Sequence, residues 1–96
     1  MDLFASTQEF AGWKPCGSQR LTESSLYPQV SHIEVAETAE YGNTMCFFMK
    51  SGGQRRIFLS RDCNLEAGDR VNPETVTLLQ FERNGETCLK AEGSKL

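Results

Sequence analysis

The stretch from Met45 to Arg61 reads MCFFMKSGGQRRIFLSR and decides the fold of this 96-residue chain. Two apolar runs rich in strand-forming residues flank a segment of small residues. Gly52 and Gly53 in that segment allow the positive φ angles that a tight hairpin turn requires. The stretch therefore predicts a β-hairpin in the middle of the chain.

Each strand of this hairpin has two chemically different faces, because alternate side chains of a strand point to opposite sides. The first strand divides into Met45, Phe47 and Met49 on one face and Cys46, Phe48 and Lys50 on the other. The second divides into Arg55, Ile57, Leu59 and Arg61 on one face and Arg56, Phe58 and Ser60 on the other. Both faces are apolar at several positions, so the periodicity leaves open which of them is buried.

The rest of the chain reads as β structure after residue 29. Alternating apolar residues predict further strands over residues 30–39, 75–83 and 86–91, and Asn84-Gly85 is a strong signal for a two-residue hairpin turn. The region before these strands is harder to interpret. Residues 2–11 favour either a short helix or an extended chain, residues 14–18 favour a turn, and residues 93–96 favour a frayed tail.

These elements predict a mostly all-β fold. We expect a small five-stranded β-barrel over residues 30–92, because closing the sheet hides the edges of its strands. Residues 1–29 would form an N-terminal extension that packs on the barrel, and residues 93–96 would form the tail.

The order of the strands, together with the stretch from Cys46 to Asp69, resembles the OB-fold. Within that class, residues 30–92 are most similar to small single-stranded DNA-binding proteins of phages and mobile elements. The resemblance implies a binding role for residues on the second and third strands, namely Phe48, Lys50, Arg56 and Phe58. Many proteins of this family carry their excess of acidic residues in a tail. This chain departs from that pattern, because it is acidic overall but has no acidic tail.

The net charge of −3 is unevenly distributed along the chain. Residues 1–40 hold two cations and six carboxylates, whereas residues 41–70 hold five cations and three carboxylates. A local basic surface is therefore expected at the central hairpin of an acidic protein.

Aromatic rings beside cations are the chemistry that holds single-stranded nucleic acid, through base stacking and phosphate contacts. On this interpretation Phe48 and Phe58 stack on bases, and the phosphates are contacted by Lys50, Arg55, Arg56 and Arg61. The alternative is that the barrel buries the aromatic rings and the arginines only solvate its rim. The sequence does not decide between these two interpretations.

A second functional hypothesis is a small protein-interaction regulator or inhibitor of phage or mobile-element origin. The acidic N-terminal third can mimic nucleic acid toward a basic partner. Phe4, Phe10 and Trp13 are a large apolar content for so polar a segment, and they would contribute to such a contact.

We expect neither catalysis nor a metal or other cofactor. His32 lies near Glu34 and Glu37, which suggests acid–base chemistry, but no nucleophile motif accompanies it. The four cysteines have no paired metal-ligand spacing and are expected to be reduced thiols. Without an apolar span or a signal peptide, the expected location is the cytoplasm and no membrane partner is expected. A homodimer stays open, since small barrels often pair strand edges.

Overall fold

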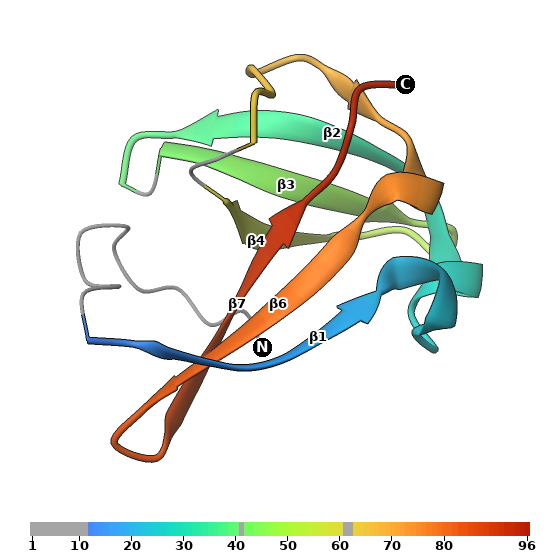
Figure 1. The fold of residues 1–96 in the computed structure, drawn as a ribbon. Helices are drawn as coiled ribbons and strands as arrows, with labels where there is room; N and C mark the ends of the chain where they lie inside the picture. Colours follow the sequence, from blue (N-terminus) through green and yellow to red (C-terminus); the bar gives the residue numbers. More distant parts are fainter. Residues whose placement is uncertain (1–11, 41, 61–62) are drawn as a thin grey trace.

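The computed structural model describes residues 12–40, 42–60 and 63–96, and these residues are mostly β (Figure 1). They form the strands β1 (Lys14–Arg20), β2 (Val30–Thr38), β3 (Gly42–Met49), β4 (Gln54–Leu59), β5 (Arg70–Val71), β6 (Thr77–Arg83) and β7 (Glu86–Glu92). Single turns of 3₁₀ helix connect some of them: η2 (Leu21–Glu23), η3 (Tyr27–Gln29) and η4 (Pro73–Thr75). The predicted mostly-β class is confirmed.

The strands form one sheet in the order β1-β6-β7-β4-β3-β2-β5. Its pairings are antiparallel except that of β4 with β7, which is parallel. The sheet curls into a half-barrel in which β2 and β3 form one wall, and β7, β6 and β1 form the other (Figure 1). The predicted count of five strands is wrong, because the described residues contain seven.

The turn predicted over residues 14–18 is wrong, because these residues belong to strand β1, whose sequence KPCGSQR shows no apolar alternation. All seven of its residues are exposed, and in the described part of the chain it pairs only with β6. An edge strand of this kind needs no buried side, and it tolerates Pro15 because one row of its backbone groups has no partner. Part of the predicted N-terminal extension is therefore built into the sheet. The helix predicted over residues 2–11 lies outside the described residues.

The two predicted hairpin turns are confirmed. Gly52 and Gly53 have φ angles of 93° and 81° between β3 and β4. Asn84 and Gly85 have φ angles of 51° and 82° between β6 and β7, the paired positive values of a type I′ turn. That turn type matches the right-handed twist of the strands, which explains why Asn-Gly is a reliable hairpin signal.

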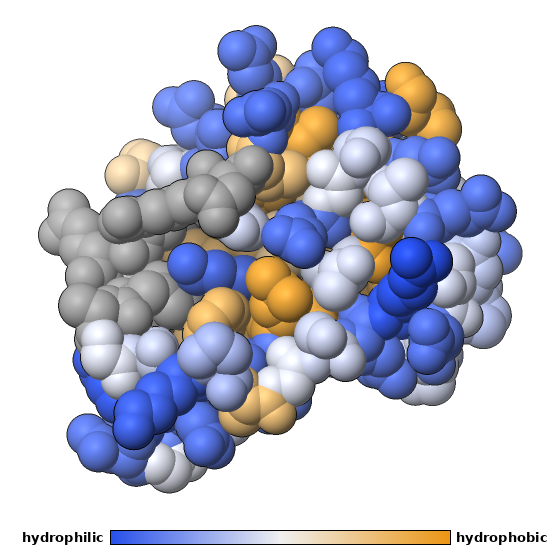
Figure 2. Space-filling model, viewed as in Figure 1, coloured by the Kyte–Doolittle hydropathy of each residue, from blue (hydrophilic) through white to orange (hydrophobic). Residues whose placement is uncertain are grey.

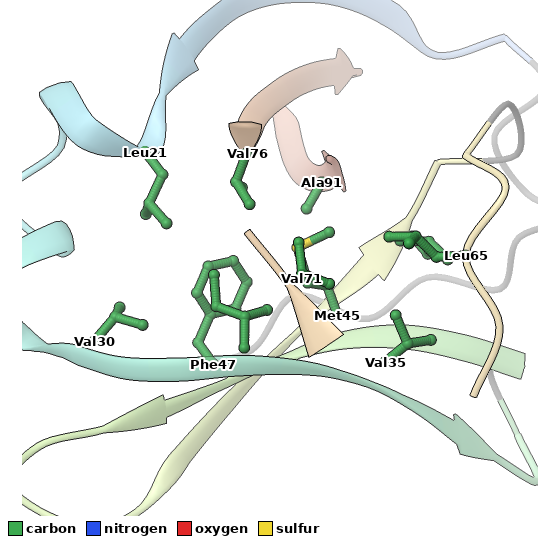
Figure 3. Close-up of a cluster of buried hydrophobic side chains, with 11 residues drawn as sticks. Leu21, Val30, Val35, Met45, Phe47, Leu65, Val71, Val76 and Ala91 are labelled. Atoms are coloured by element: carbon green, nitrogen blue, oxygen red, sulfur yellow. The ribbon is translucent and has the colours of Figure 1, made fainter. Parts of the chain in front are cut away.

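The main hydrophobic core fills the inside of the half-barrel, where side chains from most strands converge (Figure 3). Its members are Leu21, Val30, Ile33, Val35, Met45, Phe47, Leu59, Leu65, Val71, Val76 and Ala91. Met45 and Phe47 are 0% exposed, and the face of the central hairpin that carries them is the one turned inward. The structure thereby decides a question that the periodicity left open.

The C-terminal residues are tied to β5 and do not form the predicted frayed tail. The Leu96 N–H donates to the Arg70 carbonyl at 2.8 Å, and Val71 forms an antiparallel bridge with Lys95. Lys95 Nζ also lies 3.3 Å from Asp69 Oδ1. The Glu66 N–H, which donates to the Asp69 carboxylate at 2.9 Å, lowers the pKa of Asp69, and Lys95 adds to this effect. Backbone pairing thus orders a segment whose sequence is polar.

Candidate functional site

Strands β2, β3 and β4 turn a second face away from the main core, and we call it the outer face. The register places its side chains in three rows that run across the strands. From the β3–β4 turn outward, these rows are His32, Phe48 and Gln54; then Glu34, Cys46 and Arg56; then Ala36, Thr44 and Phe58.

The outer face is accessible at one end and buried at the other. In the row nearest the β3–β4 turn, His32 and Phe48 are half-buried and Gln54 is exposed. In the third row Thr44 and Phe58 are 0% exposed. The ring of Phe58, predicted to stack on a base, therefore offers no surface to a ligand. Only the end of the outer face near the turn is open for binding.

A pair of stacked rings stands at this open end. The rings of His32 and Phe48 lie with centroids 4.4 Å apart and an interplanar angle of 12°. They come from directly opposed positions on β2 and β3, where side chains of an antiparallel pair stand side by side. Rings stacked in this way cover one face of each other, so a further planar group can extend the stack on an outer ring face; we call this stacked pair the platform.

Charged groups surround this platform. Glu34 Oε2 lies 3.6 Å from His32 Nε2, and Glu34 Oε1 accepts a hydrogen bond from Arg70 Nε at 3.2 Å. Arg56 lies in the second row and is half-buried, and Lys50 is exposed at the end of β3. Among the described residues the platform therefore has three cations on its side of the sheet and one carboxylate, which is paired with one of them, Arg70.

The predicted site residues do not all lie together. Phe48, Lys50 and Arg56 belong to the open part of the outer face. Arg55 is opposite Phe47 in the register, so its side chain starts on the inner side of the sheet. Arg61 lies outside the described residues. Arg55 and Arg56, which are adjacent in β4, therefore lie on opposite faces of the sheet, because successive side chains of a strand alternate between its faces.

His32 and Arg70 join the site although the predicted binding set did not include them. His32 was considered only for acid–base chemistry, and Arg70 was not considered. Pairing the strand over residues 30–39 with the central hairpin would have placed His32 beside Phe48. No signal in the sequence places Arg70, because β5 is two residues long and its register depends on the folded sheet.

A groove of about 610 Å³ opens on the inner side of the sheet, at the end where β1 has no second partner. Its apolar lining comes from Leu26, Met49, Ile57, Leu78 and Leu89. Glutamines and serines supply polar groups, and Arg55 is the one charged residue among the described residues that line the groove. Figure 2 shows apolar surface in the middle of the molecule, bordered by hydrophilic side chains.

Other kinds of site find less support in the described part of the chain. No group of three or more His, Cys, Asp or Glu is placed there to hold a metal ion. None of the four cysteines forms a disulfide, and burial raises the pKa of Cys88, which is 2% exposed. None of the helices among the described residues is long and apolar enough to cross a membrane.

Comparison of the chain with protein-family models, curated proteins and solved structures gave no match. The resemblance to single-stranded DNA-binding OB-fold proteins therefore stays a prediction. The outer face itself is the basis on which a function can be argued.

Proposed function

We propose that this protein is a non-catalytic module that binds single-stranded nucleic acid at the open end of its outer face. The observation that carries the proposal is the parallel stack of His32 on Phe48. A base can extend this stack on an outer ring face, and cations lie on the same face of the sheet, which is the chemistry that single strands require.

Each part of the site has a defined role in this proposal. A base stacks on the platform, which is favourable for any base because every base has a π-face. Lys50, Arg56 and Arg70 contact phosphates, and the exposed amide of Gln54 is a hydrogen-bonding group beside Phe48. Recognition would depend little on sequence, since stacking and phosphate contacts do not distinguish bases.

Glu34 is the one group that repels phosphate in the part of the site that the structure describes. Its carboxylate lies 3.2 Å from Arg70 Nε, and this ion pair reduces the field that a nearby phosphate experiences. The basic character of the site is therefore local, and it is compatible with a chain whose net charge is −3.

The proposal accommodates the OB-like resemblance in a modified form. The central hairpin would still carry the ligand, but on a seven-stranded half-barrel and with Phe58 acting as a buried packing residue. The second candidate function, a protein-interaction regulator, is favoured by a separate observation, the full exposure of strand β1.

Fluorescence anisotropy of a labelled oligothymidylate, titrated with the protein at several salt concentrations, tests the proposal. With three cations on phosphates, the logarithm of the affinity should fall against the logarithm of salt with a slope of about −2. The absence of binding at low salt would refute it.

Two substitutions locate the binding face. Phe48→Ala removes the platform and should weaken binding by roughly 5- to 150-fold, the range expected for the loss of one stacked base. Arg56→Gln should reduce the salt slope by about 0.7. Arg55→Gln is the matched control, since it removes the same charge from the neighbouring position on the other face, and it should leave DNA binding unchanged.

A further inference from the structure

Strand β1 presents an open backbone edge. Among the described residues it pairs only with β6, and the Leu21 N–H donates to the Val76 carbonyl at 2.9 Å. Backbone groups of an antiparallel strand alternate between its two sides. In this register the N–H and C=O groups of Ser18 and Arg20 therefore point away from β6, where an added strand would meet them.

Part of this edge is protected and part is not. Pro15 has no N–H, and the register shifts between Pro15 and Gly17, which are features that discourage pairing along an edge. Residues 17–20 have neither feature and are all exposed. The open edge is therefore short and well defined, with room for about four residues of a partner strand.

The groove on the inner side of the sheet lies beside this same edge. Gly17, Ser18 and Gln19 line it together with the apolar side chains of β4, β6 and β7. A strand added to β1 would direct alternate side chains toward the groove. Backbone pairing and apolar contact are thus available at one place, the arrangement used when a sheet binds an extended peptide.

We propose that the edge of β1 at residues 17–20, together with the groove, docks an extended acidic peptide segment of a protein partner. The charges favour an acidic peptide. β1 carries Lys14 and Arg20 without a carboxylate, and Arg55 is the one charged residue that lines the groove among the residues that the structure describes. In the same part of the chain the nearby carboxylates are Glu82, opposite Lys14, and Glu23, which lies beside residues 18–20 but does not line the groove.

A second copy of this chain fits the edge less well than an acidic peptide. Two β1 strands paired antiparallel over residues 17–20 would bring Arg20 of each copy and no carboxylate into the added ladder. An acidic peptide would instead supply carboxylates that pair with Arg20 across the strands.

The test uses the full chain and a fluorescein-labelled heptapeptide with valine and glutamate alternating at its odd positions and threonine between them, so that both side-chain types face the groove. We expect saturable binding below about 1 mM at low salt, and changes in the amide NMR shifts of Ser18 and Arg20. The same peptide with N-methyl groups on the backbone nitrogens that face β1 should bind about tenfold more weakly, because two hydrogen bonds are lost. This control leaves the protein unaltered, so misfolding cannot imitate its result.

The neighbouring arginines separate this site from the proposed nucleic-acid face. Arg55→Gln should weaken peptide binding roughly two- to fivefold and leave oligothymidylate binding unchanged, whereas Arg56→Gln should do the reverse. Failure of one proposal is thus distinguishable from failure of the other.

Four results would overturn the docking proposal. They are no binding of the wild-type protein below about 1 mM, equal binding of the N-methylated peptide, displacement of the peptide by oligothymidylate, and a concentration-dependent dimer that the peptide dissociates. The third would assign the groove to nucleic acid, and the fourth would assign the edge of β1 to a second copy.

Discussion

Phe58 and Phe48 share the outer face but should respond very differently to truncation. Phe58 is 0% exposed, whereas Phe48 is half-buried and stacks on His32 at the open end. We predict that Phe58→Ala mainly destabilises the protein, whereas Phe48→Ala mainly weakens nucleic-acid binding. The comparison tests the division of the outer face into a buried end and an open end.

The magnitudes follow from burial. Truncating a fully buried Phe costs about 3–5 kcal/mol, from the lost transfer free energy and the cavity left behind. The entropy of unfolding of a 96-residue chain is about 0.2 kcal/mol per kelvin, so Phe58→Ala should lower Tm by roughly 15–25 °C. Phe48→Ala loses the ring stack and part of its burial, about 1–2 kcal/mol, or roughly 5–10 °C.

Thermal unfolding followed by circular dichroism, with urea titration as a check, measures both changes. Phe47→Ala provides the reference, since Phe47 is also 0% exposed but lies in the main core. Its loss of stability should match that of Phe58→Ala. A Phe58→Ala protein that is as stable as Phe48→Ala would show that the buried end of the outer face is wrongly assigned.

Four further predictions concern thiol reactivity, two pH dependences of stability and turn geometry. Exposed Cys16 should react with Ellman's reagent within the mixing time, whereas buried Cys88, whose pKa is raised by burial, should react only as the protein unfolds. Because the raised pKa of Cys88 favours its neutral form in the folded state, its contribution to stability should be complete at neutral pH and fall above about pH 9, as measured by urea titration across pH. The lowered pKa of Asp69 has the opposite sign, so its contribution is present above about pH 4 and lost in more acidic solution, and Asp69→Asn should remove that pH dependence. Gly85→Ala should cost about 1–2 kcal/mol in urea unfolding, because φ at Gly85 is 82°, and an unchanged stability would contradict the type I′ turn.

Much of the fold could be predicted from local signals. The central hairpin and the Asn84-Gly85 turn were predictable because their glycines and flanking apolar residues act within a few positions of each other. Strand β1 was not predictable, because its polar sequence forms a strand only where β6 offers a partner. The ordered C-terminus depends likewise on the two residues of β5.

The candidate site shows the same division. Alternation along the central hairpin correctly separated Phe48 and Arg56 from Arg55, since each strand places neighbouring residues on opposite faces. It did not indicate that Phe58 is buried, because burial on an outer face depends on what packs against it. Nor did the alternation predict the hydrogen bond between Arg70 and Glu34, because these residues are 36 positions apart in the chain.

The amino-acid sequence by itself determined the β character of the chain, its two tight hairpins and the composition of each face of the central hairpin. These properties depend on φ preferences and on a period of two, which act over a few residues. The tertiary structure alone decided which face became the main core, which aromatic ring remained accessible and where an edge stayed open. Those outcomes depend on contacts between strands far apart in the chain, whose pairing no local pattern specifies.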